Sequence, residues 1–414
     1  MDRRSFLTSA TAGAAALTLG PKLASARVLG ANNRVRIGII GAGSRGQEDM
    51  RSVLALKDVE FVAIADTYSR RRDEAKALAS GAEVYDDPRL LLDRKDIDGV
   101  IVATPVFLHH KYFVDTLAAG KDLYCEKTMT WDIAEAIDCR QKAAASSQVI
   151  QIGLQHESSG EHADAREWYK QGLTGKVTSV EAWMGRNSPH GKGQWVRPIP
   201  ADCDPQHVDW KKFLNDRPDE PFSGNRYINW RLFWEFSGGN LTENLVHQIT
   251  WIISVLGLKE PLAATMSGGI FSEKDGRQVP DTIAVTLEYP ELIVTWQSTF
   301  SNSHFGLGER FMGSDGTIEH LWGATDMVTG KSVSRVDYYP EKVNRRDGSI
   351  LHGENKGVDH MQNWIDCIRS RKRETNAPVE VGYYSAVAAH MANLAYRQQR
   401  RLTWEDARNA HQEY

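Results

Sequence analysis

The sequence lacks a long apolar run and any block of charges of a single sign. Its 414 residues include 50 Lys and Arg against 54 Asp and Glu, and both signs are scattered along the chain. This even distribution argues against a nucleic-acid groove and against binding to an anionic membrane surface. It favours a small neutral ligand. The length and the 41% hydrophobic content are sufficient for two globular domains.

Cysteine is scarce and shows no close spacing. The sequence contains four, which are Cys125, Cys139, Cys203 and Cys367. Without a CxxC pair, neither a zinc site nor a redox disulfide is indicated, and we expect no bound metal. We expect these thiols to be mostly buried and unpaired.

The first residues have the pattern of a targeting segment. Arg3 and Arg4 precede a short Ala-rich run over residues 10–19, and an Ala-Ser-Ala sequence ending at Ala26 has the spacing that a signal peptidase accepts. The run is shorter than the roughly 20 residues that cross a bilayer. The pattern resembles a twin-arginine signal, which exports proteins that are already folded. We expect residues 1–26 to be removed and the protein to be periplasmic or otherwise exported. The alternatives are an uncleaved membrane anchor and an Ala-rich leader without a targeting function.

From residue 33 the chain alternates β-branched runs with helical stretches. Strands are expected at residues 35–40, 61–65, 99–104, 122–125 and 149–153. Strands that alternate with helices predict a doubly wound parallel sheet. We therefore expect an α/β domain of the Rossmann type over residues 33–155.

Beyond residue 155 the chain is richer in Trp, Gly and polar loops. Longer alternating stretches at residues 177–185, 282–289 and 293–301 predict an open, mainly antiparallel sheet with helices on one face. We expect an α+β domain over residues 156–414. Helices predicted at residues 358–371 and 383–399 could pack on either domain.

A glycine-rich turn links the first strand to the first helix. It consists of Gly41, Ala42, Gly43, Ser44, Arg45 and Gly46. In a dinucleotide fingerprint the first glycine allows the tight turn, the second lets the backbone approach a pyrophosphate, and the third permits close packing of helix on strand. The helix N-terminus then faces the anionic phosphates. The turn predicts a dinucleotide site.

An acidic residue stands at the position that this fingerprint requires. Asp66 lies 20 residues after Gly46 and follows the second strand directly. A carboxylate there can bind the adenosine ribose and favours NAD. Arg70 and its two arginine neighbours are close enough to stack on adenine or to bind a 2'-phosphate, so NADP remains an alternative.

Polar residues follow two more of the predicted strands. Thr104 and Pro105 end one strand and lead to His109, and Glu126 and Lys127 end the next. In a parallel sheet these ends meet at the edge where ligands bind. We expect Thr104, Pro105, His109 and Glu126 beside the cofactor, with a purely structural role for His109 as the alternative. A lysine at this place can bind the reacting oxygen.

These features together resemble the Gfo/Idh/MocA family of oxidoreductases. The resemblance rests on the turn at Gly41, the segment from Thr104 to His109, the sequence Cys125-Glu126-Lys127, and the segment from Gly238 to His247. It extends over most of residues 33–405. It implies the two-domain fold described above, a nicotinamide cofactor and a sugar or polyol as the substrate.

The resemblance also implies roles for three residues. Lys127 would contact the reacting hydroxyl or carbonyl, His247 would act as acid and base, and Glu243 would orient His247. Glu243 and His247 are four residues apart, so on an α-helix they share a face and can bond. The sequence departs from the family at Thr128, where a proline is usual, and at Glu243, where an aspartate is usual.

Candidate substrate residues lie in two places. Trp230 and Arg231 belong to an aromatic cluster, and an aromatic face beside an arginine suits a sugar ring; packing in the core is the alternative. His156 begins the second domain at the expected cleft. Family members often pair their open sheets, and we expect a homodimer or homotetramer.

Export bears on the expected reaction, because little NAD is available outside the cytoplasm to renew the cofactor. We expect a tightly bound cofactor that is reoxidised in the same site. A dehydrogenase of a sugar, glycoside or polyol is the first hypothesis. The alternatives are an NAD-dependent glycoside hydrolase or lyase that oxidises its sugar transiently, and a non-catalytic binding protein.

Overall fold

The computed structural model describes residues 34–189, 191–325, 330–343 and 348–410. The first domain is built around a sheet of parallel strands. The strands are β1 (Val35–Ile40), β2 (Val59–Ala65), β3 (Glu83–Tyr85), β4 (Gly99–Val102), β5 (Asp122–Glu126) and β6 (Ile150–Gly153). Their order in the sheet is β3-β2-β1-β4-β5-β6, the order of a Rossmann fold. The helices between them are α1 (Ser44–Leu54), α2 (Ser69–Leu78), α3 (Pro88–Asp93), α4 (His109–Ala118) and α5 (Ile133–Ala145).

The predicted doubly wound sheet is confirmed, and five of its strands lie within a few residues of the predicted positions. Strand β3 was not predicted. It has three residues, two of which are exposed, so it carries no apolar run.

The second layer is a nine-stranded sheet. Its strands are β7 (Val177–Gly185), β8 (Ala263–Gly269), β9 (Thr282–Tyr289), β10 (Leu292–Thr299), β11 (Leu307–Gly313), β12 (Gly316–Thr325), β13 (Ser332–Pro340), β14 (Leu351–His352) and β15 (Leu402–Thr403). The order is β14-β13-β12-β11-β7-β10-β9-β8-β15, with β7 and β10 parallel and the other neighbours antiparallel. The prediction of a mainly antiparallel sheet is therefore confirmed.

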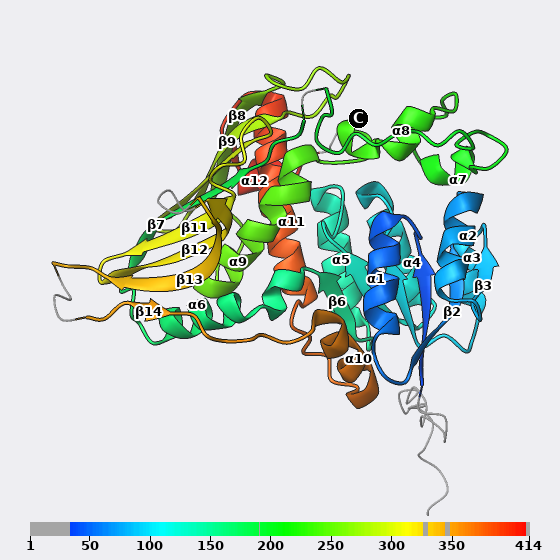
Figure 1. The fold of residues 1–414 in the computed structure, drawn as a ribbon, viewed down its shortest axis with the longest axis horizontal. Helices are drawn as coiled ribbons and strands as arrows, with labels where there is room; N and C mark the ends of the chain where they lie inside the picture. The colour runs from blue at the N-terminus through cyan, green and yellow to red at the C-terminus, as the bar shows by residue number, and fades with distance from the viewer. Residues whose placement is uncertain (1–33, 190, 326–329, 344–347, 411–414) are drawn as a thin grey trace, which may run out of the picture. The chain divides into compact units, whose positions relative to one another are not determined.

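The helices of the second half of the chain either cover one face of this sheet or pack against the first domain. They are α6 (Gly160–Lys170), α7 (Trp210–Leu214), α8 (Gly224–Ile228), α9 (Val246–Leu256), α10 (His360–Ser370), α11 (Val379–Gln398) and α12 (Trp404–Arg408). Trp251 of α9 packs on Phe311 of β11, with ring centroids 5.5 Å apart. Figure 1 shows α11 running between the two sheets.

Helix α10 packs on the first domain, a choice that the sequence did not determine. Its Trp364 is fully buried and packs on Tyr124 of β5, and Gly99 of β4 leaves room for the indole because a Cβ there would lie 3.1 Å from it. Arg371 also pairs with Asp122 at 2.6 Å. Helix α10 thus completes the core of the parallel sheet, although it comes near the end of the chain.

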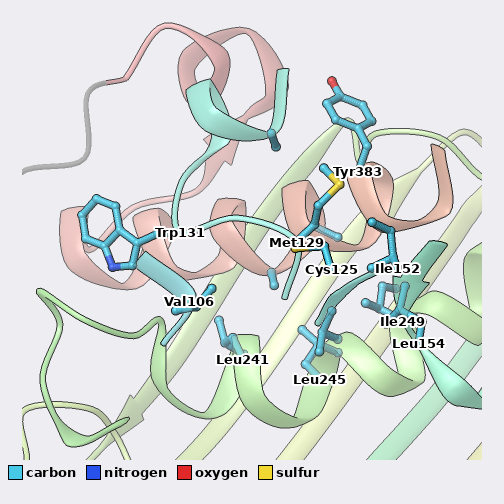
Figure 2. Packing of buried hydrophobic residues seen from close by; sticks show 14 of the residues in the cluster. Val106, Cys125, Met129, Trp131, Ile152, Leu154, Leu241, Leu245, Ile249 and Tyr383 are labelled. Carbon is cyan, nitrogen blue, oxygen red and sulfur yellow. The ribbon is translucent and has the colours of Figure 1, made fainter. Parts of the chain in front are cut away.

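An apolar cluster joins the two layers next to the expected site. Figure 2 shows Cys125 and Ile152 of the first sheet packed with Leu241, Leu245 and Ile249 of the second domain. Burial of such surface stabilises a fold by roughly 25 cal/mol per Å². The two domains therefore share one core.

The segment of residues 191–236 crosses over the first domain. Its backbone pairs with the residues after β2, since Ser69 N donates to His207 O at 3.0 Å and Asp209 N donates to Thr67 O at 2.9 Å. In Figure 1, α7 and α8 of this segment lie above the ends of α2 and α4. The segment covers the edge of the parallel sheet where ligands are expected.

The cysteines and the N-terminal segment were also subjects of the sequence analysis. The four cysteines are buried free thiols, as predicted. Residues 1–26, the predicted signal, lie outside the described residues. Among the residues that are described, no helix is long and apolar enough to cross a membrane.

Candidate functional site

The glycine-rich turn has the backbone that a dinucleotide fingerprint requires. Gly41 has a φ of +92°, and a Cβ there would lie 2.7 Å from the backbone of Ala103. A Cβ on Gly46 would lie 2.1 Å from the carbonyl oxygen of Gly41. Gly43 caps helix α1 without a side-chain bond, and Ser44 and Arg45 begin the helix. The N-terminal N–H groups of α1 thus remain directed at a phosphate-sized ligand.

Asp66 lies in a small pocket next to this turn. Its carboxylate accepts hydrogen bonds from the N–H groups of Ala42 at 2.7 Å and Tyr68 at 2.9 Å. Tyr227 of the crossing segment lines the same pocket and donates to Asp66 at 3.4 Å. The acid is therefore held at the predicted place by both domains.

The arginine in this pocket is Arg71 and not Arg70. Arg70 is half exposed and pairs with Glu74 at 3.1 Å and Asp202 at 2.7 Å, so it turns away from the pocket. The guanidinium of Arg71 lies over the ring of Tyr227, 5.2 Å from its centroid. Consecutive helical residues point about 100° apart, and the sequence alone could not tell which arginine faces inward.

The larger cavity, about 400 Å³, lies between the two domains. Twelve of the predicted residues line it: Gly43, Ser44, Arg45, Thr104, Pro105, His109, Glu126, Lys127, Trp230, Arg231, Glu243 and His247. Gly41 and Asp66 line the smaller pocket, and Arg70 and His156 line neither. The convergence of both domains on one cavity is the arrangement that the sequence predicted.

His109 fixes the ends of two neighbouring strands. Its ring nitrogens contact Thr104 O at 2.8 Å and Thr128 O at 2.7 Å. Burial lowers the pKa of His109, although the two carbonyl contacts oppose this effect. His109 thereby holds the segment of Thr104 against the segment of Lys127. The Lys127–Thr128 peptide bond is cis.

A buried carboxylate joins Lys127 to the second domain. Glu243 Oε2 accepts from Lys127 Nζ at 3.1 Å and from Arg231 Nε at 2.9 Å. Burial opposes ionisation of Glu243, but the charges of Lys127 and Arg231 outweigh it and lower its pKa to about 2. Arg231 also lies over the ring of Trp230, 4.2 Å from its centroid.

The expected bond between Glu243 and His247 is not formed. Residues Leu241–Leu245 form a π-helical turn, and α9 begins after it. A π-turn holds more residues than an α-turn, so positions four apart no longer lie directly above one another. Glu243 turns to Lys127 and Arg231 instead, and it positions the lysine and not the histidine.

His247 lines the cavity as a neutral imidazole. Burial and the nearby charge of Lys127 lower its pKa well below 6.5. Its Nδ1 is buried and has no hydrogen-bond partner among the described residues. His156 lies behind it, with ring centroids 5.6 Å apart, and burial lowers the pKa of His156 to about 4. His156 therefore contacts His247 and not the cavity.

Glu126 is the centre of a second polar group. It accepts from Arg45 Nε at 3.0 Å and from Gln155 Nε2 at 2.9 Å. Arg45 also pairs with the buried Asp49 at 2.7 Å. These bonds tie the glycine-rich turn to the end of β5.

The cavity contains residues that sequence reasoning did not single out. Arg186, Trp195, Arg197 and Asn244 come from the second domain, and Arg197 donates to Ser44 Oγ at 2.5 Å. Asn244 lies within the segment from Gly238 to His247, whereas no motif marks the other three, although Arg186 directly follows a predicted strand. Among the described residues, no group of three or more His, Cys, Asp or Glu side chains is arranged to hold a metal ion.

The residues fit a dinucleotide. Thr104 Oγ1 is buried in the wall of both pockets and has no partner among the described residues, and Gly43 offers backbone where a side chain would stand. The fold and this site define a two-domain, dinucleotide-dependent oxidoreductase. A family profile described as an oxidoreductase family with an NAD-binding Rossmann fold matches residues 35–154, and the profile of its C-terminal alpha/beta domain matches residues 218–404. The chain belongs to the Gfo/Idh/MocA family, and its first domain is an NAD-binding Rossmann domain.

Individual relatives agree with this assignment. The chain is 29% identical over 183 residues to an inositol 2-dehydrogenase of Gluconacetobacter diazotrophicus, which covers 44% of this chain and 54% of that protein. It is 26% identical over 235 residues to glycosyl hydrolase family 109 protein 2 of Shewanella sp. strain ANA-3, covering 47% and 50%. The chain thus spans about half the length of the curated relatives it matches.

A solved structure shows the same fold. The WlbA dehydrogenase of Bordetella pertussis, in complex with NADH and UDP-GlcNAcA, superposes with a TM-score of 0.65 at 16% identity, covering 89% of this chain and 98% of that one.

Replacing Glu243 by Gln removes the charge that Lys127 and Arg231 share. We expect stability to fall by about 3–5 kcal/mol near neutral pH, the usual cost of removing one partner of a buried ion pair. The folded-state pKa of about 2 lies below the ordinary 4.5, so this contribution is complete above pH 4.5 and is lost as the pH falls towards 2.

Denaturant unfolding of the wild type and Glu243→Gln at about pH 7 and about pH 3 measures the effect. The difference between their free energies of unfolding should be smaller at the lower pH. Glu405→Gln, an exposed exchange of the same chemistry, is the control. Equal stability of Glu243→Gln and wild type at neutral pH would contradict the prediction.

Proposed function

We propose that the protein oxidises a hydroxyl group of a sugar, glycoside or polyol, using NAD held in its first domain. The observation that carries this proposal is the pairing of Lys127, a hydrogen-bond donor, with His247, a neutral imidazole, on one wall of a cavity whose other wall is the glycine-rich turn. Oxidation of an alcohol requires a hydrogen-bond donor and a base at the oxygen of its hydroxyl group.

Each residue has a distinct task in this proposal. Lys127 donates a hydrogen bond to the substrate oxygen, and Glu243 fixes its ammonium at 3.1 Å. His247 takes the proton of the hydroxyl, because its lowered pKa leaves the ring unprotonated. When bound, NAD supplies the acceptor for the hydride of the carbinol carbon. The crossing segment of residues 191–236 covers the site and would exclude water from it.

A second candidate function is cleavage of a glycoside through transient oxidation of its sugar. The similarity to a protein of glycosyl hydrolase family 109 favours it. His247 and Lys127 would serve the oxidation and the final reduction alike. Analysis of the products distinguishes the two functions, since a dehydrogenase yields an oxidised sugar and a hydrolase or lyase yields a shortened one.

Replacing His247 by Asn should lower kcat roughly 10²- to 10⁴-fold, the usual contribution of a general base, without loss of bound NAD. In the wild type, burial and the charge of Lys127 lower the pKa of His247, so protonation should inactivate the enzyme only below pH 6.5. Turnover of a panel of polyols, aldoses and glycosides across pH, followed by the absorbance of reduced nicotinamide, measures both effects.

His352→Asn, at an exposed position of β14, is the control for the loss of an imidazole. Full activity of His247→Asn, or an acid limb above pH 6.5 in the wild type, would refute the assignment of His247 as the base.

We also propose export by the twin-arginine route with the cofactor already bound, which the pattern around Arg3 and Arg4 supports. The cover formed by residues 191–236 supports retention of the cofactor, because its backbone bonds to Ser69 and Thr67 hold it over the first domain. The exported protein should begin at Arg27 and release about one equivalent of NAD per chain on denaturation, both measured by mass spectrometry. An uncleaved N-terminus, or a purified protein free of dinucleotide, would contradict this proposal.

We further propose that two copies pair through the open face of the nine-stranded sheet. This face has a hollow lined by Phe271 and Phe305, which are 67% and 60% exposed, and Ile293 of β10 is also exposed. Large exposed apolar patches mark interaction sites.

Light scattering should give the molar mass of at least a dimer. Phe305→Asp should lower this mass towards that of the monomer, whereas Leu90→Asp on α3 should not change it. A monomeric wild type would exclude this interface.

A further inference from the structure

Arg186 extends from the end of a central strand into the catalytic end of the cavity. It directly follows β7, and its N–H donates to Thr299 O at 2.9 Å, which fixes its backbone. Its side chain lines the cavity together with Lys127, Glu243 and His247. Its charge is one of those that lower the pKa of His247, so the guanidinium lies near the proposed base.

This guanidinium lacks a partner. In the part of the chain that the structure describes, it makes no hydrogen bond and no ion pair, whereas Glu243 is already bound by Lys127 and Arg231. Arginine stays charged in proteins, and withdrawing a charge from water without a partner is costly. A cation left in this state inside a cavity indicates that the ligand brings the anion.

The cofactor does not supply the anion that Arg186 lacks. At the phosphate end, Arg197 already donates to Ser44 of the glycine-rich turn. At the adenosine end, Arg71 lines the pocket of Asp66. Arg186 lies at the opposite end, beside His247. Each of these three arginines therefore has its own part of the cavity, and the part of Arg186 belongs to the substrate.

The charge of the whole cavity leads to the same conclusion. Among the described residues, six cationic side chains line it, namely Arg45, Arg71, Lys127, Arg186, Arg197 and Arg231. Three carboxylates oppose them, Glu48, Glu126 and Glu243. Asp49 pairs with Arg45, and Asp66 lies near Arg71, both just outside the lining. The pyrophosphate of NAD, bound at the glycine-rich turn, would meet Arg197, so the charge of Arg186 remains in excess. A neutral sugar would leave this charge uncompensated.

We propose that the substrate is a sugar acid whose carboxylate binds Arg186 while one of its hydroxyl groups faces Lys127 and His247. The fork of a guanidinium matches a carboxylate in two parallel hydrogen bonds. This inference rests on the proposed function. It names the substrate class, which the even overall charge of the sequence does not reveal, because the excess charge is local to the cavity.

The test compares matched substrates on the NAD-loaded protein. Hexuronic acids and their methyl glycosides are set against the parent hexoses, and kcat/KM is measured for each through reduction of the nicotinamide. The wild type should prefer the acid. In Arg186→Gln, kcat/KM for the acid should fall roughly 10- to 100-fold more than for the hexose, the usual cost of losing a charged hydrogen-bond partner. The loss of kcat/KM for the acid should be intermediate in Arg186→Lys, because lysine keeps the charge but cannot form two parallel hydrogen bonds to a carboxylate.

A merely structural role for Arg186 predicts equal losses on both substrates and thus an unchanged ratio, which would overturn the inference. The control is Arg89→Gln, an exposed arginine that pairs with Asp87 at the surface and whose loss should leave the ratio at the wild-type value. Preference of the wild type for the neutral hexose, or for a hexose phosphate, would also overturn it.

Equilibrium binding of the hexuronic acid, measured by titration calorimetry, separates this inference from the proposed function. If the acid binds in a manner that depends on Arg186 but never reduces the nicotinamide, the inference stands and the proposed oxidation fails. If hexoses reduce the nicotinamide while the acid neither binds nor reacts, the proposed function stands and the inference fails.

Discussion

The carboxylate of Glu243 is the interaction on which the site depends. It comes from the second domain, and it binds Lys127 at the end of β5 and Arg231 of the crossing segment. Lys127 of the first domain and two residues of the second domain, Arg231 and Glu243, therefore meet at one oxygen atom. A buried carboxylate with two cations is stable only where all three are held in place. The surrounding structure has to supply that rigidity.

Helix α11 supplies much of it, because its side chains contact both sides of the cavity. His390 contacts the carbonyl oxygen of Thr130, three residues after Lys127, at 3.0 Å. Asn393 donates to the carbonyl oxygen of Gly238, which precedes the π-helical turn, at 2.9 Å. Together with the apolar cluster of Figure 2, these bonds hold Lys127 and Glu243 in a fixed position relative to each other. The catalytic groups are thus placed by the core that the two domains share.

The sequence predicted those features that depend on local pattern. The glycine-rich turn, the position of Asp66 and the ends of β4 and β5 follow from residues close together in the chain, and the structure has them where they were expected. Glu243 was assigned to the cavity correctly, but its partner was wrong. The assumption of an α-helical turn gave the wrong geometry, and the π-turn is not visible in the spacing of the residues.

Other features could not be predicted because they depend on tertiary contacts. Arg71 faces inward and Arg70 outward because Asp202 and Tyr227 of a distant segment select between them. His156 lies behind His247 because the ring of Trp322, 4.5 Å away, packs on it from the far sheet. Arg186 belongs to no motif. Its importance appears only when the partners of every other charge in the cavity are known.

The charge around His247 has a consequence for the direction of the reaction. No carboxylate among the described residues binds its Nδ1, and burial together with cations lowers its pKa. Such an imidazole accepts a proton only when the oxygen is already activated, here by Lys127, and it returns the proton readily. An anionic substrate beside Arg186 would offset part of the positive field when it binds and so make His247 a better base. Catalytic competence would then arise only in the complex, and the same site could run the oxidation and its reversal without releasing the cofactor.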